Sequence, residues 1–309
     1  MSTIGARAES IQPNAPTSQC LCGTQRVGKT VTLAARFGPD SWASGTIRYM
    51  SVNQIEDVIA ALDNTIQQAW EQNSRIGYFA ALYRRVTHAV RDGLSSGSFQ
   101  NAPLMEQLDV VFASRYLDAL AAHQSGGTPS RSWKLAFEAC SDDSRLILQH
   151  LLAGMNAHIN LDLGVASAQV SPGDQLPLLQ ADFDEINDVL AAQVGAVESE
   201  MAALSPLIKN LSTVGLSSET TLINFNIGLA RKAAWNIAER LASEPSMLHE
   251  VTIDGLDLAV SVAGRAILYP PFKAEALAEI LAAELKDVRG VIEILAREQP
   301  KPASTSEAN

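Results

Sequence analysis

Cysteine is scarce in this sequence and does not form a disulfide framework. Cys20, Cys22 and Cys140 are the three cysteines in 309 residues, an odd number that suits a reducing compartment. Cys20 and Cys22 are too close for a typical zinc half-site, and the sequence has no second pair to complete one. Residues 1–19 lack the apolar segment of a secretory signal. We therefore expect a cytoplasmic protein.

Positive charge is scarce as well. Lys and Arg number 23 against 34 Asp and Glu, which gives a formal net charge of −11. Binding to nucleic-acid phosphates depends on clustered Lys and Arg, so we expect no nucleic-acid partner. An anionic membrane surface is disfavoured for the same reason. No apolar run reaches the ~18 residues that cross a bilayer, so we also expect no membrane span.

Apolar residues in helical spacing are what the sequence has in quantity. Hydrophobic residues make up 47% of the chain and charged residues 18%, which is typical of a globular protein rather than a disordered one. From residue 51 onward, apolar side chains recur at i, i+3 and i+4, the period of helices that bury one face. We predict an all-α fold, a multi-helix bundle around a central buried helix at 144–168.

The composition divides the chain into three predicted segments. Residues 1–50 are rich in Ser, Thr, Gly, Pro and Ala and are expected to form a loosely ordered, irregular N-terminal arm. Residues 51–298 are expected to form a single helical domain, with its core at 51–210 and a C-terminal helical extension at 211–298. The polar residues 299–309 are predicted to be a disordered tail.

One motif in the arm invites a nucleotide-binding interpretation. The segment GTQRVGKT at 23–30 matches the phosphate-loop pattern G-x-x-x-x-G-K-[ST]. A phosphate loop needs a strand before it and a helix after it, so that backbone N–H groups converge on the phosphate. The preceding PTSQCLC makes a poor buried strand, and nothing downstream resembles a parallel sheet. We interpret the motif as a chance match.

The central stretch SRLILQHLLAGMNAHINLDLGVASA (144–168) carries polar residues where a plain core helix would carry Leu or Ala. At ~100° per residue, His158 and Asp162 fall inside its broad apolar face with i,i+4 spacing, so their side chains can touch. Asn156 and Asn160 follow one flank as a polar stripe. Because a buried polar group without a partner costs several kcal/mol, the His–Asp pair must be hydrogen-bonded, paired or metal-bound.

Small residues mark the side of this helix that faces away from the apolar side chains. Gly154, Ala157 and Gly164 lie roughly opposite the apolar face. Without bulky side chains there, another helix can approach closely. We therefore expect the central helix to be wrapped by other helices on most sides.

Parts of this region resemble a known protein family. The stretch AGMNAHINLDL at 153–163, with LDVVFASRYL at 108–117 and DFDEIN at 182–187, is similar to an uncharacterised, all-helical bacterial family of unknown function. The hallmark of that family is an A-G-M-N-A-H-I-N-x-D-L core, and the similarity covers roughly residues 50–210. The resemblance implies a helical fold and marks the four polar residues of the central helix as the site to test, without supplying an activity.

The favoured functional hypothesis is an enzyme, without a cofactor, that acts on an apolar small molecule. Asp162 would orient His158 as a general acid or base near neutral pH, and Asn156 or Asn160 would donate a hydrogen bond to an oxygen that gains charge. An apolar helical pocket suits an isomerase, cyclase, lyase or hydrolase. The sequence has no G-x-S-x-G nucleophile motif, which disfavours covalent acyl chemistry.

Two alternatives remain open. In the first, His158 and Asp162, with a contribution from His150, hold a divalent metal such as zinc or iron that activates water for hydrolysis. In the second, the protein is a non-catalytic ligand-binding or structural protein, and the polar cluster is an internal network that fixes helix register.

Charged residues outside the central helix receive more ordinary interpretations. Asp109 and Arg115 could each serve a pocket, but we favour a surface or structural ion pair for both. Asp182 is expected to be a helix N-cap, with a role beside His158 as the alternative. Arg85 is expected to lie on a solvated helix face.

Overall fold

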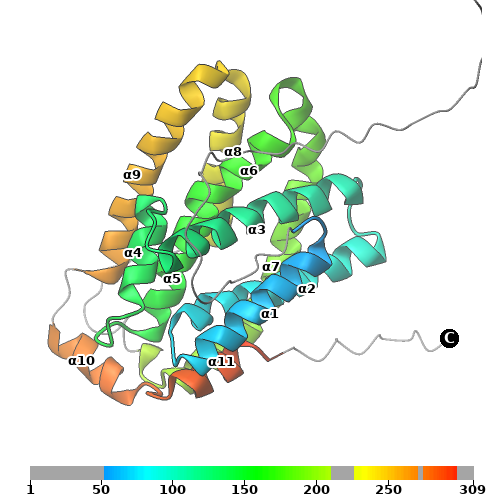
Figure 1. The fold of residues 1–309 in the computed structure, drawn as a ribbon. Helices are drawn as coiled ribbons and strands as arrows, with labels where there is room; N and C mark the ends of the chain where they lie inside the picture. The colour runs from blue at the N-terminus through cyan, green and yellow to red at the C-terminus, as the bar shows by residue number, and fades with distance from the viewer. Residues whose placement is uncertain (1–51, 210–225, 271–273, 298–309) are drawn as a thin grey trace, which may run out of the picture. The chain divides into compact units, whose positions relative to one another are not determined.

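The computed structural model describes residues 52–209, 226–270 and 274–297, and every regular element in these ranges is a helix (Figure 1). The prediction of an all-α fold is thus confirmed. The helices, in chain order, are α1 (Ile55–Glu71), α2 (Ile76–Ser96), α3 (Ala102–Gln124), α4 (Arg131–Ala139), α5 (Ile147–Ala157), the π-helix η1 (His158–Leu163), α6 (Gly164–Val170), the 3-10 helix η2 (Gly173–Leu179), α7 (Gln180–Leu204), α8 (Ile227–Ser243), the 3-10 helix η4 (Ser246–Leu248), α9 (His249–Leu268), α10 (Ala274–Ala283) and α11 (Val288–Leu295).

Several sequence predictions fall outside these ranges. The predicted N-terminal arm at 1–50, the phosphate-loop match at 23–30 and the predicted tail at 299–309 all lie outside the described residues. None of the described helices has both the length and the apolar character that crossing a membrane requires.

The central helix predicted at 144–168 exists, but it is not a regular α-helix. α5, η1 and α6 follow one another without a break, and nearly all of their residues are buried. The six residues of η1 form a π-helix, in which each hydrogen bond spans one residue more than in an α-helix. α2, α4 and α9 pack against α5, while α3 and α8 pack against η1 and α6. The expectation that other helices wrap this one is confirmed.

Two glycines of the central helix let neighbouring helices pack closely against it, as predicted from its small residues. A Cβ atom on Gly154 would lie 2.7 Å from the ring of Phe79 on α2. A Cβ atom on Gly164 would lie 2.6 Å from the carbonyl oxygen of Ala234, which belongs to the backbone of α8. Real Cβ contacts are longer than this, so a side chain at either position would push a neighbouring helix away from the central one.

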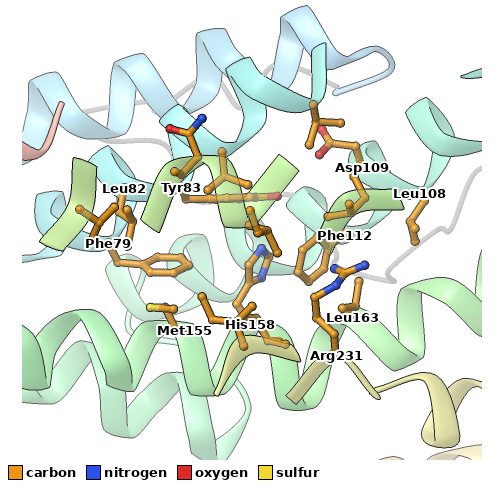
Figure 2. Close-up of a pocket in the computed structure, with 18 of the residues that line it drawn as sticks. Phe79, Leu82, Tyr83, Leu108, Asp109, Phe112, Met155, His158, Leu163 and Arg231 are labelled. Atoms are coloured by element: carbon orange, nitrogen blue, oxygen red, sulfur yellow. The ribbon is translucent and has the colours of Figure 1, made fainter. Parts of the chain in front are cut away.

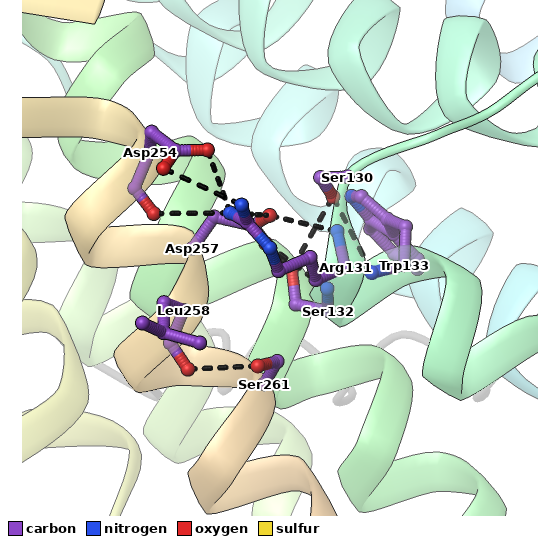
Figure 3. A network of polar contacts seen from close by, with 8 residues as sticks. All are labelled: Ser130, Arg131, Ser132, Trp133, Asp254, Asp257, Leu258 and Ser261. Atoms are coloured by element: carbon purple, nitrogen blue, oxygen red, sulfur yellow. Dashed lines mark hydrogen bonds and ion pairs between the residues drawn. The ribbon is translucent and has the colours of Figure 1, made fainter. Parts of the chain in front are cut away.

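A buried carboxylate joins α9 to the start of α4 (Figure 3). Asp257 on α9 accepts hydrogen bonds from the backbone N–H of Arg131 at 2.7 Å and from that of Ser132 at 3.0 Å. It also accepts one from the Ser132 hydroxyl at 2.7 Å. These N–H groups have no partner within α4, because the first turn of a helix leaves its donors unsatisfied. The contact fixes the position of α4, which carries Trp133 to the interior.

Two charged residues have structural roles that the sequence predictions missed. Asp182 lies in the first turn of α7, and its carboxylate accepts the backbone N–H groups of Gln100 and Asn101, both at 2.7 Å. It is therefore neither an N-cap nor a partner of His158. Arg85 is buried and forms an ion pair with Glu200 of α7, so the prediction of a solvated face was wrong for this residue.

Candidate functional site

A cavity of about 250 Å³ lies between α2, α3, η1, α7 and α8 (Figure 2). Apolar side chains form most of its wall, and the few polar ones are Asp109, His158, Gln193, Glu198 and Arg231, with the hydroxyl of Tyr83. An engineered apolar cavity of ~150 Å³ already holds benzene. This cavity therefore has room for a molecule larger than a single aromatic ring. The apolar residues of the wall are Phe79, Leu82, Val86, Val90, Met105, Leu108, Phe112, Met155, Ile159, Leu163, Ile186, Leu190, Val197 and Ile227.

His158, the first residue of η1, is enclosed by aromatic rings on the cavity wall. Its imidazole stacks on Phe112 with ring centroids 3.6 Å apart and planes 9° from parallel. The rings of Tyr83 and Phe79 meet it edge-on at 4.4 and 5.6 Å. Both ring nitrogens of His158 are buried, and no described residue forms a hydrogen bond with either of them. Burial lowers the pKa of His158, since desolvation penalises the charged imidazolium, and the imidazole is neutral at pH 7.

Asp162 lies beside His158, as the i,i+4 spacing predicts. Its Oδ2 is 3.7 Å from Nδ1 of His158. Its short hydrogen bonds go elsewhere, however, because Oδ1 accepts from Arg115 Nε at 2.8 Å and Oδ2 accepts from Trp133 Nε1 at 2.7 Å. The favoured ion pair for Arg115 is thus present, and its partner is this buried carboxylate. Asp162 joins α3 and α4 to the central helix while keeping negative charge near His158.

Asn156 and Asn160 are not on the cavity wall. The side-chain amide of Asn156 donates to the carbonyl oxygen of Val260 on α9 at 2.9 Å. Asn160 in turn donates to Oδ1 of Asn156 at 3.0 Å. We expected one of these amides to stabilise an oxygen in the site. The structure instead directs this polar stripe towards α9, because α9 packs on that flank of the central helix.

His150 does not join His158 and Asp162. Its ring meets Tyr78 edge-on at 5.9 Å, and burial lowers its pKa to about 4. Within the described part of the chain, no three His, Cys, Asp or Glu side chains come together as metal ligands. The predicted metal set of His158, Asp162 and His150 is therefore not assembled, because ~80° of helical rotation separates the two histidines.

Asp109 on α3 is the cavity residue that the sequence analysis undervalued. It is 8% exposed, and within the ranges that the structure describes its buried Oδ2 has no hydrogen-bond partner and its carboxyl group no ion pair. Burial raises its pKa from 3.8 to about 7, with a smaller contribution from the neighbouring Glu106. The sequence did hold a signal, since Asp109 falls on the apolar face of α3 with Leu108 and Phe112, where a charged residue is unusual.

Arg231 on α8 is the one basic residue on the described cavity wall, and it already has partners. Its Nε donates to Oδ1 of Asn187 at 2.9 Å, and its Nη2 donates to the carbonyl oxygen of Phe183. The guanidinium also lies over the ring of Phe183 at 4.3 Å. Burial lowers its pKa to about 10, so it stays charged at neutral pH. Arg231 therefore holds α8 against α7 at the edge of the cavity.

Comparisons with known proteins identify a family but no activity. A family model described as "Family of unknown function (DUF5995)" matches residues 55–270. No curated protein and no solved structure matches the chain.

Proposed function

The chain belongs to the DUF5995 family, whose function is unknown, and we propose that it is an enzyme that binds an apolar small molecule in the central cavity and moves a proton on it with His158. The observation that supports this most directly is the state of His158. A neutral imidazole with two unpartnered nitrogens lies on the wall of a cavity that is otherwise almost entirely apolar. A neutral imidazole accepts a proton, as a general base must.

The surroundings of His158 are those of a positioned base. The stack on Phe112 and the contact with Tyr83 hold the ring plane in place. Asp162 is 3.7 Å away and is held in place by Arg115 and Trp133. Its negative charge stabilises the imidazolium that forms once His158 has taken a proton. A π-helix is rare, and such segments occur frequently at functional sites, so its presence at His158 agrees with this role.

Binding without catalysis is the second candidate, and one observation favours it. The short hydrogen bonds of Asp162 go to Arg115 and Trp133 rather than to His158. An orienting carboxylate in an acid–base pair normally accepts the imidazole N–H directly. A protein that only stores or carries an apolar molecule would need the cavity but not that hydrogen bond.

Untargeted mass spectrometry distinguishes the two candidates. Wild-type protein and a His158→Gln variant are incubated in D₂O with an apolar extract of bacterial cells, and the compounds are compared before and after. An enzyme converts compounds, or exchanges their carbon-bound hydrogen for deuterium, only when His158 is present. The glutamine variant should retain the thermal unfolding midpoint of the wild type to within a few degrees, which its circular dichroism would verify.

Other results would count against the enzyme. Compounds that bind both proteins and stay unchanged would support the non-catalytic candidate. Equal conversion by the two proteins would remove His158 from the reaction. A second variant, Asn160→Ala, alters the polar stripe outside the cavity and serves as the control, because the proposal expects it to keep activity.

A further inference from the structure

The cavity wall contains a buried acid that no group in the described part of the chain pairs with. Among the described residues Asp109 has no hydrogen bond or ion pair, and the charged neighbour that shifts its pKa is another carboxylate, Glu106. An ionised carboxyl group in an apolar site is costly unless a cation or donor pairs with it. Since Asp109 lines the cavity, the missing partner can come from a molecule that enters it.

We propose that the cavity binds an apolar amine, whose ammonium group pairs with the carboxylate of Asp109 while its apolar body occupies the space beside His158. This rests on the proposed function in that it names the substrate class for the same cavity. Asp109 is then the residue that selects the ligand, and His158 the residue that acts on it.

Two features of the wall and the net charge of the chain favour a cation over other ligands. The rings of Tyr83 and Phe112 line the same space, and aromatic ring faces attract ammonium groups. Glu198 of α7 is an exposed carboxylate on the same wall, so an approaching cation also meets negative charge there. The net charge of −11 raises the local concentration of cations around the whole protein.

The guanidinium on the wall already donates hydrogen bonds to the protein. Arg231 could attract an anionic ligand such as a carboxylate, but its Nε and Nη2 donate to Asn187 and Phe183. Asp109 has no such bonds. Among the described residues of this wall, the buried charged group that lacks a hydrogen bond is therefore the carboxyl of Asp109, which a cationic donor would satisfy.

The pH dependence of binding follows from the groups around Asp109. Those facing the cavity are Tyr83 on α2, His158 on η1, Glu198 on α7 and Arg231 on α8, with Glu106 on the same helix as Asp109. His158 is neutral at pH 7 and Arg231 is charged throughout the range below about 10. Burial raises the pKa of the Asp109 carboxyl group to about 7. Amine binding should therefore strengthen as the pH rises towards about 8.

Three probes that share one apolar group test the inference, with their affinities measured by titration calorimetry at about pH 8. They are phenylbutylamine, which is a cation, phenylbutanol, which is neutral, and phenylbutyrate, which is an anion. A charge-assisted hydrogen bond distinguishes the cation from the alcohol by about tenfold or more in Kd. We expect the amine to bind most tightly and the anion most weakly.

Two variants assign the preference to its residue. Asp109→Asn keeps the size of the side chain. It should lower the affinity for the amine to that for the alcohol, and the affinity for the alcohol should not change. Asp118→Asn is the matched control, because it removes an exposed carboxylate nine residues along α3, on the opposite side of that helix. This control should keep the full preference for the amine.

Each outcome is decisive. Equal binding of amine and alcohol, tighter binding of the anion, or no binding of any probe by the wild type would overturn the inference. A fourth probe, a ketone with the same apolar group, would bind more tightly as the pH falls below 7 if Asp109 instead acts as a neutral hydrogen-bond donor, and that result would also overturn the inference. His158→Gln separates the two proposals, since it should abolish turnover yet keep the amine preference.

Discussion

Replacing Asp109 by asparagine should remove a pH-dependent loss of stability from the folded protein. In the wild type, burial raises the pKa of Asp109 from 3.8 to about 7. Between these pH values the folded chain keeps a proton that the unfolded chain releases, so the free energy of unfolding falls as the pH rises. Above pH 7 the unpaired carboxylate is present in the cavity wall and the full cost applies.

The magnitude follows from the difference between the two pKa values. That difference is about three, and each pH unit is worth ~1.4 kcal/mol, so the ionised carboxyl costs up to about 4 kcal/mol above pH 7. Water that enters the cavity solvates the carboxylate and reduces this figure. Asp109→Asn replaces the carboxyl with a group of the same shape that stays neutral. Its stability should equal that of the wild type at about pH 4 and exceed it by a few kcal/mol at about pH 8.

Urea unfolding followed by tryptophan fluorescence, over a series of pH values, measures this difference. Asp188→Asn, which removes an exposed carboxylate of α7, is the control and should run parallel to the wild type. Parallel curves for the wild type and Asp109→Asn would refute the reasoning. They would mean that Asp109 has a protein partner or full access to water.

Three further substitutions test how the site is held. Gly164→Ala would place a Cβ atom 2.6 Å from the backbone oxygen of Ala234 and should lower the free energy of unfolding in urea by about 1–3 kcal/mol. Gly195→Ala is the control, because Gly195 has open space around it, and it should not lower the stability. Trp133→Phe removes the 2.7 Å hydrogen bond to Asp162 and should lower the free energy of unfolding by about 1.5–3 kcal/mol. An unchanged urea midpoint would show that Arg115 alone satisfies that carboxylate. Asp257→Asn weakens three hydrogen bonds at the start of α4 and should lower the stability by about 1–3 kcal/mol in thermal unfolding. Its control, Asp254→Asn at an exposed position, should have a much smaller effect. Equal effects from the two variants would contradict the role of Asp257.

The helical architecture was accessible from local pattern. Apolar spacing predicted helices from residue 51 onward, and it placed the central helix within a few residues of the ends of α5 and α6. The end of the predicted C-terminal extension shows the limit of local pattern, because it is divided into α10 and α11. Glu284, in the break, is buried and accepts the backbone N–H of Ile147. A contact over this sequence distance leaves no trace in a local window.

The site was only partly predictable, for the same physical reason. The i,i+4 spacing placed Asp162 beside His158 because that distance depends on one helix alone. The partner of Asn156 is a carbonyl on α9, and helical period shows which flank a residue occupies but not which helix covers that flank. The π-helical turn at His158 likewise has no local sequence signal that we recognised.

What the sequence by itself determined was therefore the all-helical class, the place of the central helix and the pairing of His158 with Asp162 within it. Tertiary structure alone decided that Asp162 would bind Arg115 and Trp133, that Asn156 would turn to α9, and that Asp109 would line the cavity without a partner. Periodicity reports on neighbours within a few residues, whereas a buried polar group is satisfied by whichever chain segment packs against it, and that segment is chosen by the fold as a whole.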